Sequence, residues 1–487
     1  MMSSTASATA RTLLLLIQRG EISLATPHIR DYKGKIIYMI GIGGSSMSGL
    51  AQMLHDKGYH VTGSDKTHSH AVERLEEAGM KIFIGHYAEN VAGADLLIYS
   101  AAIHPDNPER MYAAAHDIPQ IERAELLGQV MEGHEAAVCI SGAHGKTTAS
   151  SMLAQTLLEC DLDPAIHIGG HIDAIGGGTR IGGDKVFVAE ACEFAGSFLH
   201  MKPTVAVVLN IDEDHLDYYG DMAHIEEAFF NFCSLVPQAG LALGWGEDER
   251  VQKLFTRLSC RTQTFGFTDK CDWYAKDLTY VHGCPHYTAT FKGDEICRVE
   301  LKVAGRFNVI NSLSAIASAY ELGADMQRAA QSLSNFVGVH RRFEHTGDID
   351  GVHMYHDYGH NPVEMRGALS VACEQNANRV WAVMQPHTFS RVKTLFDGYL
   401  TCTEQADFTL VTDICAAREV DPGDINSGMI VEGMKKNGIN AVWTPSFDDT
   451  EAYLRAHWQP GDLVLTMGCG DINLLNEQMH KHGDTKK

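Results

Sequence analysis

A glycine-rich run at residues 140–148, Ile-Ser-Gly-Ala-His-Gly-Lys-Thr-Thr, constrains the fold of this chain more than any other segment. It follows an apolar stretch at residues 135–139, which predicts a buried strand, and precedes residues 149–158, which predict a helix. In such a strand–turn–helix unit, backbone N–H groups and the helix dipole face an anion, Lys146 reaches the outer phosphates, and the Thr147 hydroxyl can ligate Mg²⁺. Ile140 stands where the full phosphate-loop pattern has Gly, so the run alone leaves an ordinary helix-capping turn open.

Length, charge and cysteine usage narrow the classes of function. At 487 residues the chain is too long for a single core, and about 150 residues per domain suggests three domains. The formal net charge of −23 argues against binding to nucleic acid or to an anionic membrane surface. An anionic substrate must therefore be held by local cations and helix N-termini. The 12 Cys include no CxxC pair, which favours reduced thiols in a cytoplasmic protein over a disulfide or zinc framework.

The N-terminal residues carry a short apolar run. No apolar stretch in the chain approaches the ~20 residues that cross a bilayer, so we expect no membrane insertion. The run at residues 13–17 lies between Arg11 and Arg19 and is too short for the apolar part of a secretory signal. We therefore expect residues 1–33 to form an N-terminal extension with one or two helical turns.

A second glycine-rich turn opens the next segment. Residues 35–40 predict a strand that leads into Gly41-Ile42-Gly43-Gly44 and a helix, and a second strand at residues 60–62 ends before Gly63-Ser64-Asp65. An acidic residue about 20 positions after such a turn is typical of a Rossmann dinucleotide-binding unit. Because Ser46 takes the place of the third glycine, this motif by itself leaves a nicotinamide-dependent oxidoreductase open.

Further apolar runs alternate with helical patterns through the rest of the chain. They predict strands at residues 81–84, 96–100, 185–189, 205–209, 380–384, 408–411 and 463–466, shorter strands between residues 260 and 305, and a helix at 311–322. Continuous apolar runs are typical of buried parallel strands. We therefore predict an α/β protein of three domains: a Rossmann-like domain at 34–132, a central phosphate-loop domain with a mostly parallel sheet at 133–336, and a C-terminal Rossmann-like domain at 337–487.

Acidic clusters directly follow two strands of the predicted central domain. Glu190-Ala-Cys-Glu193 follows the strand at 185–189, and Asn-Ile-Asp-Glu-Asp-His-Leu-Asp at residues 210–217 follows the strand at 205–209. The carboxyl ends of parallel strands share one edge of a sheet, where α/β proteins bind ligands. Carboxylates and His215 should therefore converge near Thr147, in an oxygen-rich set that suits Mg²⁺. A solvated acidic loop is the alternative interpretation.

The C-terminal third carries clusters of cations and histidines. Its clusters are His340-Arg341-Arg342-Phe343, residues 356–362 (HDYGHNP), residues 385–391 (QPHTFSR) and Ala416-Ala417-Arg418-Glu419. Any one of these could form a surface ion pair. Their repeated position after predicted strands favours a shared cleft instead, in which Arg could offset the charge of a transferring phosphoryl group.

Together these motifs resemble those of the Mur ligase family over about residues 35–475. In chain order they are GIGGSSMSG at 41–49, GAHGKTT at 142–148, EACE at 190–193, NIDEDHLDYYG at 210–220, GRFNVIN at 305–311, HRRFE at 340–344, HDYGHNP at 356–362, QPHTFSR at 385–391 and DICAARE at 413–419. The glycine-rich opening and the DYGH segment are most similar to members that add L-alanine to UDP-N-acetylmuramate. The resemblance implies a cytoplasmic monomer or homodimer that makes a peptidoglycan precursor with ATP and Mg²⁺, through an acyl-phosphate intermediate.

The resemblance also implies roles for individual residues. The UDP-sugar would be bound by Gly43, Gly44, Ser45, Ser64 and Asp65, and ATP by Gly142, His144, Gly145, Lys146, Thr147, Thr148, Asn308, Asn311, Arg342 and Asp357. The metal would be held by Thr147, Glu190 and His215, although His215 could instead be the base that accepts a proton from the alanine ammonium. The catalytic set would be Lys146, His215, Arg342, His360 and Arg391. The C-terminal domain would close over the active site.

Three positions depart from the family pattern. Phe307 stands where a His commonly precedes the Asn, His356 replaces a usual Asp, and Thr388 replaces a frequent Arg. Three other functions remain to be weighed: another amide ligase of the superfamily, a nicotinamide-dependent oxidoreductase, and a non-catalytic nucleotide-binding regulator. Lys146, Glu190, His215 and Arg342 argue against the regulator, which needs no residues for phosphoryl transfer.

Overall fold

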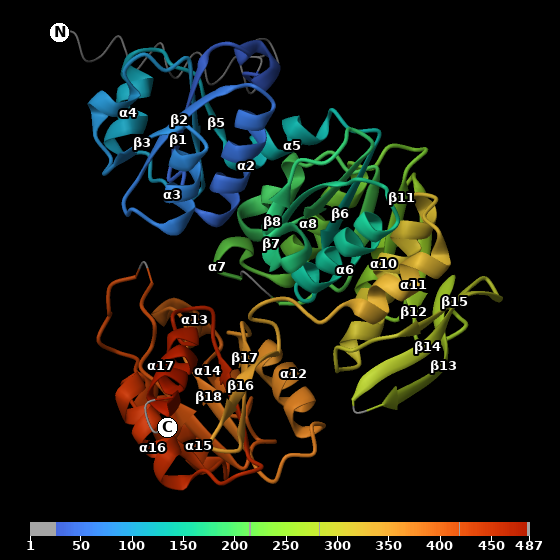
Figure 1. Cartoon of the computed structure of the whole chain (residues 1–487), viewed down its shortest axis with the longest axis vertical. Helices are drawn as coiled ribbons and strands as arrows, with labels where there is room; N and C mark the ends of the chain where they lie inside the picture. The colour runs from blue at the N-terminus through green and yellow to red at the C-terminus, as the bar shows by residue number, and fades with distance from the viewer. Residues whose placement is uncertain (1–25, 214–215, 282, 418, 485–487) are drawn as a thin grey trace. The chain divides into compact units, whose positions relative to one another are not determined.

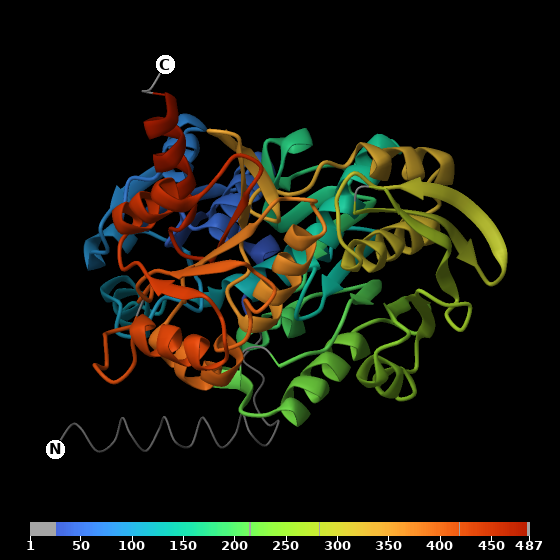
Figure 2. The same ribbon diagram turned by 90° about the horizontal axis from the view of Figure 1, so that it is seen from below.

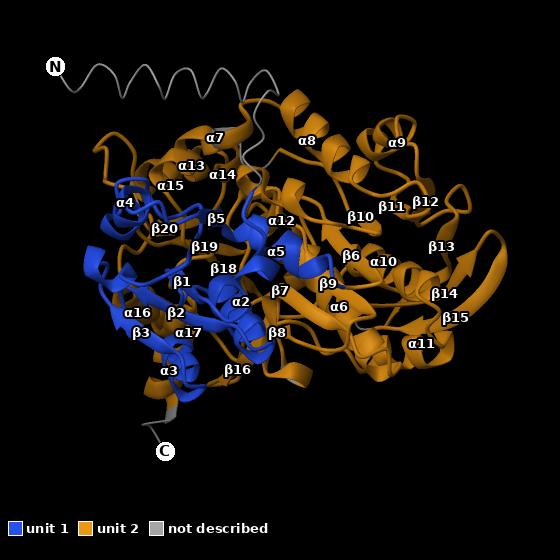
Figure 3. Ribbon diagram, turned by 90° about the horizontal axis from the view of Figure 1, so that it is seen from above, with its two compact units in different colours: residues 1–133 blue, residues 134–487 orange. Residues whose placement is uncertain are grey.

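The computed structural model describes residues 26–213, 216–281, 283–417 and 419–484, which form three β-sheets with their helices (Figure 1). The chain divides into two compact units, residues 1–133 and residues 134–487 (Figure 3). The first unit contains one sheet and the second contains two. Among the helices described, none is long and apolar enough to cross a membrane.

The first unit is built around a parallel sheet in the order β3-β2-β1-β4-β5. Its strands are β1 (Ile36–Ile40), β2 (His60–Asp65), β3 (Lys81–Ile84), β4 (Leu96–Tyr99) and β5 (Gln120–Glu122), and its α-helices are α2 (Ser45–Asp56), α3 (His70–Glu77), α4 (Pro108–Ala115) and α5 (Arg123–Met131). Four of the five residues of β1 are buried. The predicted βαβ start is therefore confirmed, with its glycine-rich turn between β1 and α2.

A short segment before β1 is fixed to the first unit. Residues 1–25 of the predicted extension lie outside the described residues. A 3₁₀ turn, η1 (Ile29–Tyr32), follows them, and the Ile29 side chain is 3% exposed. The backbone N–H of Ile29 donates to Gln129 Oε1 at 2.8 Å, and His28 Nε2 lies 3.0 Å from Glu132 Oε2. The last residues of the predicted extension thus pack on α5.

The first sheet of the second unit has ten strands in the order β15-β14-β13-β12-β11-β10-β6-β9-β7-β8. They are β6 (Ala136–Ser141), β7 (Ala165–Ile172), β8 (Gly177–Arg180), β9 (Val186–Glu190), β10 (Val205–Val208), β11 (Leu241–Trp245), β12 (Arg261–Gly266), β13 (Trp273–Val281), β14 (Cys284–Phe291) and β15 (Asp294–Glu300). The central strand β6 pairs in parallel with both β10 and β9. The strands β13, β14 and β15 form an antiparallel extension at one end, which is visible in Figures 1 and 2.

The α-helices between residues 146 and 335 accompany the ten-stranded sheet, whose large apolar core includes three of them. These α-helices are α6 (Lys146–Glu159), α7 (Leu216–Tyr219), α8 (Met222–Ser234), α9 (Glu249–Phe255), α10 (Phe307–Glu321) and α11 (Met326–Asn335). The core joins α6, α10 and α11 to the strands through residues such as Leu153, Ile316 and Leu333. The helix predicted at residues 311–322 begins four residues earlier, because the chain turns at Gly305 and the asparagines that follow already lie in the helix.

The second sheet of this unit has the order β16-β17-β21-β18-β19-β20. Its strands are β16 (Glu344–Ile349), β17 (Val352–Asp357), β18 (Val380–Met384), β19 (Phe408–Val411), β20 (Ala441–Trp443) and β21 (Leu463–Met467), and its α-helices are α12 (Pro362–Cys373), α13 (Phe389–Thr394), α14 (Phe396–Tyr399), α15 (Ser427–Lys436), α16 (Phe447–His457) and α17 (Asn473–Asp484). All pairs are parallel except β16–β17, which is an antiparallel edge hairpin. The α/β class is confirmed in all three sheets.

Candidate active site

The loop between β6 and α6 has the backbone geometry of a phosphate cradle. Gly142 and Gly145 have φ values of 143° and 87°, in the region that favours glycine. A Cβ on Gly145 would lie 2.6 Å from Asn311 Oδ1, and a Cβ on Gly142 would lie 3.0 Å from Leu209 Cβ. Gly145 caps α6 without a side-chain hydrogen bond, which leaves N–H groups of the first turn for an anion. That the anion is ATP stays a prediction.

Lys146 is the first residue of α6, and its ammonium turns back into this loop. Its Nζ donates to Gly142 O at 2.6 Å and pairs with Glu193 Oε1 at 2.9 Å. The Glu193 side chain is only 2% exposed, and its Oε2 has no hydrogen-bond partner among the described residues. Burial alone would lower the pKa of Lys146, but the adjacent carboxylates outweigh it and raise that pKa. A fixed positive charge therefore lies at the phosphate loop.

Thr147 in the first turn of α6 contacts Glu190, which is the last residue of the neighbouring strand β9. Thr147 Oγ1 donates to the Glu190 carboxylate, with distances of 3.1 and 3.0 Å to its two oxygens. The strand pairing explains the approach, because Ile140 at the end of β6 is in register with Glu190 at the end of β9. A hydroxyl and a carboxylate beside a phosphate loop are hard oxygen donors, so the residues present fit Mg²⁺. His215, the third predicted ligand, lies outside the described residues.

His144 lies between two carboxylates that come from different elements. Its Nε2 is 3.5 Å from Asp212 Oδ2, and its Nδ1 is 3.5 Å from Glu364 Oε1. Its backbone N–H donates to Asn210 Oδ1 at 2.9 Å, which fixes the loop to the end of β10. Burial disfavours the charged ring, but Asp212 and Glu364 outweigh that effect and raise the pKa of His144 to about 9. The ring is therefore a second cation of this loop at neutral pH.

Asp357 and Arg342 lie together where β17 ends. Asp357 Oδ2 accepts the backbone N–H of Phe343 at 2.8 Å, and Oδ1 accepts that of Gly359 at 2.6 Å. Burial raises the pKa of Asp357, while Arg342 and the two N–H groups act in the opposite direction. The Arg342 guanidinium lies 5.0 Å from the centroid of the Tyr358 ring, a cation–π distance. Backbone and ring contacts thus hold both side chains in place.

His360 and Arg391 approach each other through His387. Arg391 Nη1 on α13 lies 3.3 Å from His387 Nδ1, and the His387 ring centroid is 6.1 Å from that of His360. The backbone N–H of His360 donates to Glu364 Oε2 at 3.0 Å. Burial would raise the pKa of Glu364, but His144 and other nearby cations hold it well below its usual range.

Glu364 thus connects His144 to His360, and sequence analysis did not single it out. It stands in the first turn of α12, where an acidic residue is ordinarily explained by the helix dipole. Glu193 was expected only as a member of the acidic cluster near Thr147, and the structure pairs it with Lys146. Glu193 follows β9 and so lies at the same sheet edge as the loop, whereas only the tertiary structure brings Glu364 to His144.

The two predicted adenine-binding asparagines lie inside the protein next to the loop. Asn308 is 5% exposed and Asn311 is 3% exposed. Asn308 Nδ2 donates to Ala304 O at 2.7 Å, and Asn311 Nδ2 donates to Asn308 Oδ1 at 3.0 Å. These amides therefore hydrogen-bond to each other within α10 and to the turn before it. Contact with adenine stays a prediction. Thr148, in the first turn of α6, is half-buried.

The three departures from the family pattern have different surroundings. His356 is 1% exposed, and its Nε2 accepts from Arg341 Nε at 3.2 Å. Burial, with help from the Arg341 charge, lowers the pKa of His356 to about 4, so its neutral ring acts as an acceptor that positions Arg341. Phe307 is 46% exposed at the start of α10, and Thr388 has a φ of 60° at the N-cap of α13.

The first unit contains the residues predicted for the UDP-sugar. Gly43 N donates to Asp65 Oδ2 at 2.9 Å, and a Cβ on Gly43 would lie 2.8 Å from Val72 Cγ2. Gly44 and Ser45 are exposed at the N-terminus of α2, whose N-cap makes no side-chain hydrogen bond. This glycine turn therefore offers a helix N-terminus of the kind that binds a diphosphate.

Ser64 is fully buried within a hydrogen-bond network of the first unit. Its Oγ donates to Glu109 Oε2 at 2.7 Å. Glu109 is 0% exposed and also accepts from Tyr38 Oη at 2.7 Å and Asn90 Nδ2 at 3.0 Å. His86 Nδ1 lies 3.0 Å from the same carboxylate. The Ser64 hydroxyl thus serves this network, and sequence analysis missed Glu109 and His86 because both lie outside the glycine-rich motif.

Three family models match successive parts of the chain. Their descriptions are Mur ligase family, catalytic domain, at residues 36–135; Mur ligase middle domain, at 140–319; and Mur ligase, glutamate ligase domain, at 341–470. The chain belongs to the Mur ligase family. The family inferred from the sequence motifs is therefore confirmed. The first and third sheets of this Mur ligase lie within matched segments, and the ten-stranded sheet lies within residues 140–319 except for the start of β6.

Curated relatives align with this Mur ligase over nearly its whole length. A UDP-N-acetylmuramate–L-alanine ligase from Acetivibrio thermocellus is 42% identical over 463 residues, which cover 95% of this chain and 98% of that protein. A protein of the same name from Clostridium beijerinckii is 40% identical over 454 residues, covering 93% and 99%.

Solved structures share the architecture of this Mur ligase. The UDP-N-acetylmuramate–alanine ligase MurC from Thermotoga maritima superposes with a TM-score of 0.78 at 26% identity and covers 93% of this chain and 100% of that chain. The MurF ligase from Thermotoga maritima, solved in complex with ADP, has a TM-score of 0.61 at 17% identity, with coverage of 88% and 96%, and shares the fold.

Proposed function

We propose that this Mur ligase joins L-alanine to the lactyl carboxylate of UDP-N-acetylmuramate, with conversion of ATP to ADP and phosphate. The observation that carries the proposal is the meeting of Lys146, Thr147 and Glu190 beside a glycine-rich loop at the carboxyl ends of β6 and β9. The choice of L-alanine is supported by relatives that are 40–42% identical over more than nine-tenths of this chain and bear that activity in their names.

The chemistry must activate a carboxylate, which is a poor electrophile. In the first step a lactyl carboxylate oxygen attacks the γ-phosphorus of ATP, the bond to the β-phosphate oxygen breaks, and ADP leaves. In the second step the neutral amine of L-alanine attacks the acyl carbon of the acyl phosphate. The tetrahedral intermediate then expels inorganic phosphate and leaves an amide, and the proton lost by the amine passes to a base.

Cations of the second unit would offset charge during phosphoryl transfer. Lys146 would contact the outer phosphates in place of Glu193, and Arg342 would supply a guanidinium from the end of β17. One such donor or cation typically stabilises a transition state by roughly 3–4 kcal/mol. Thr147 and Glu190 would hold Mg²⁺, together with His215 if that side chain is a ligand. Bound there, the ion would neutralise charge on phosphate oxygens.

The substrates would use other parts of the two units. The N-terminus of α2, with Gly43 and Gly44, would bind the diphosphate of the UDP-sugar, and Asp65 orients that turn. In the second unit, His360 and Arg391 would bind the amino acid or the acyl intermediate. Asp357 would contact the ATP ribose. We place the reaction in the cytoplasm, where ATP and nucleotide sugars are made.

The test is ADP release by the full chain with ATP, Mg²⁺ and UDP-N-acetylmuramate, against L-alanine, glycine, D-glutamate and no amino acid. We expect release that requires both the sugar and L-alanine. Lys146→Gln should lower this release at least about a hundredfold. Lys185→Gln, a matched change at an exposed position in the same part of the fold, should leave it unchanged. Equal release with D-glutamate, or release without any amino acid, would refute the assignment of L-alanine.

A further inference from the structure

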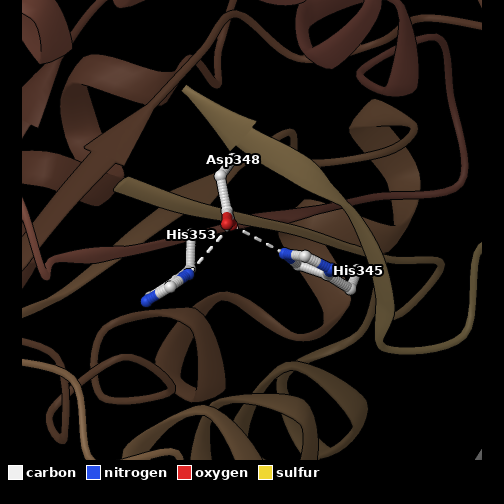
Figure 4. Close-up of side chains that lie close together, drawn as sticks. All are labelled: His345, Asp348 and His353. Carbon is white, nitrogen blue, oxygen red and sulfur yellow. Dashed lines mark hydrogen bonds and ion pairs between the residues drawn. The ribbon is translucent and has the colours of Figure 1, made fainter. Parts of the chain in front are cut away.

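The edge hairpin β16–β17 carries a cluster of side chains of the types that ligate metals, and the proposed ligase chemistry does not use them. His345, Asp348 and His353, here called the hairpin triad, each offer a ligand atom, and these atoms lie within 4.8 Å of one another. Figure 4 shows both imidazole rings directed at the same carboxylate oxygen. His345 Nε2 and His353 Nδ1 each lie 2.9 Å from Asp348 Oδ1.

A β-bulge brings the three side chains to one face of the hairpin. His353 is directly opposite Asp348 in the strand register, so these two share a face. His345 is three residues before Asp348, and in a regular strand that odd spacing would place it on the other face. The register shifts between His345 and Gly347, where Gly347 has a φ of 127°, and the extra residue returns His345 to the face of Asp348.

Neighbouring aromatic rings pack against His345 of the hairpin triad. The Tyr355 ring, on the same face of β17, lies 4.9 Å from the His345 ring and stacks on Phe343 at 4.8 Å. The two histidines also lower the pKa of Asp348, so its carboxylate is charged at neutral pH. Each triad side chain is about half exposed, at 47%, 52% and 48%, which leaves an approach from solvent.

Two imidazoles and one carboxylate select a particular class of metal. Imidazole nitrogen suits Zn²⁺, Ni²⁺, Co²⁺ and Cu²⁺, whereas Mg²⁺ prefers oxygen ligands. Zn–N and Zn–O bonds of about 2.0–2.2 Å in a tetrahedron place ligand atoms roughly 3.3 Å apart. The two 2.9 Å separations in the triad would need to open by only a few tenths of an ångström. Three protein ligands leave the remaining positions for water.

We propose that the hairpin triad is a surface binding site for a borderline divalent transition-metal ion, such as Zn²⁺ or Ni²⁺, that clamps β16 to β17. The site is separate from Thr147 and Glu190, where we propose that Mg²⁺ binds. An ion held by both strands ties together the two halves of an edge hairpin, one of which leads from Arg342 and the other into Asp357. Metal binding should therefore stabilise the segment that presents these two residues.

The test is calorimetric titration of the chelator-treated full chain with Ni²⁺, in excess Mg²⁺ so that oxygen-ligated sites are occupied. We expect His353→Gln and His345→Gln each to remove one binding event or weaken it at least about tenfold. His457→Gln is the matched control, because His457 is an exposed histidine of the same sheet's helices and lies outside the triad.

A second readout is the Ni²⁺-dependent rise in thermal midpoint, which the two triad variants should lose and the control should keep. Circular dichroism of the metal-free variants checks that they fold. Unchanged stoichiometry and affinity in both folded triad variants would overturn the proposal. Neither readout measures the amide ligase reaction, so a failure of the metal-site proposal can be distinguished from a failure of the proposed function.

Discussion

Gly145→Ala tests whether the shape of the phosphate loop is the basis of nucleotide binding. Alanine at a φ of 87° costs about 1–2 kcal/mol in backbone strain. Its Cβ would also lie 2.6 Å from Asn311 Oδ1 and 3.2 Å from Leu209 Cδ1, which adds about 1–3 kcal/mol of overpacking. The total of about 2–5 kcal/mol is expected to appear as a lower free energy of unfolding, as weaker ATP binding, or as both. Urea unfolding and titration with a fluorescent ATP analogue measure the two effects.

Gly323→Ala is the matched control for this substitution. Gly323 has a φ of 76°, and a Cβ there would meet no atom of the described residues within 4 Å. This variant therefore carries the backbone strain without the contact. We expect it to lose about 1–2 kcal/mol of stability and to bind the analogue normally. In a double-mutant cycle, Asn311→Ala should recover part of the Gly145→Ala loss, because it removes the oxygen that clashes. If Gly145→Ala matched Gly323→Ala in both assays, the argument from loop packing would be refuted.

Three further substitutions test separate parts of the site. Lys146→Gln should lower turnover by roughly 10²–10³-fold, measured by ADP release, while UDP-sugar affinity by calorimetry stays unchanged. The pKa of His144 is about 9 in the folded state and 6.5 ordinarily, so the stability contributed by its charge is complete below pH 6.5 and is lost as the pH rises through 9. His144→Gln should therefore reduce the decrease of the urea midpoint over this pH range. An unchanged pH dependence would contradict the assigned charge of His144. Glu109→Gln should lower the free energy of unfolding by about 1–3 kcal/mol and weaken UDP-sugar binding, because the buried Ser64 hydroxyl loses its carboxylate acceptor. An unaltered stability together with an unaltered UDP-sugar affinity would contradict this prediction.

Much of the fold could be predicted from the sequence, because parallel strands buried on both faces leave continuous apolar runs. The predicted strands at residues 380–384 and 408–411 coincide with β18 and β19. The antiparallel strands β13–β15 were predicted only as shorter strand-like runs. They are half-exposed at the edge of the sheet, so their apolar residues are interrupted, as the mixed burial of β13 shows.

The candidate site was predictable where a motif contains its own chemistry. The phosphate loop and the acidic residue at the end of β9 belong to contiguous motifs, and the structure brings Thr147 and Glu190 together. Glu364 and Glu109 could not be found in this way. Glu364 is 220 residues from its partner His144 in the chain, and Glu109 is 45 residues from its partner Ser64. Only the tertiary structure therefore reveals their roles.

The pairing of Lys146 with Glu193 has a consequence for the catalytic cycle. The ammonium has an internal anion at 2.9 Å, so a nucleotide bound as we propose would exchange one negative partner of Lys146 for another. When ADP departs, Glu193 can recapture the ammonium at once, and no uncompensated charge is left in the buried loop. In the proposed cycle, Glu193 would compete with ATP for Lys146 on entry and would also assist product release. The strength of the Lys146–Glu193 pair would then affect substrate affinity and turnover in opposite directions.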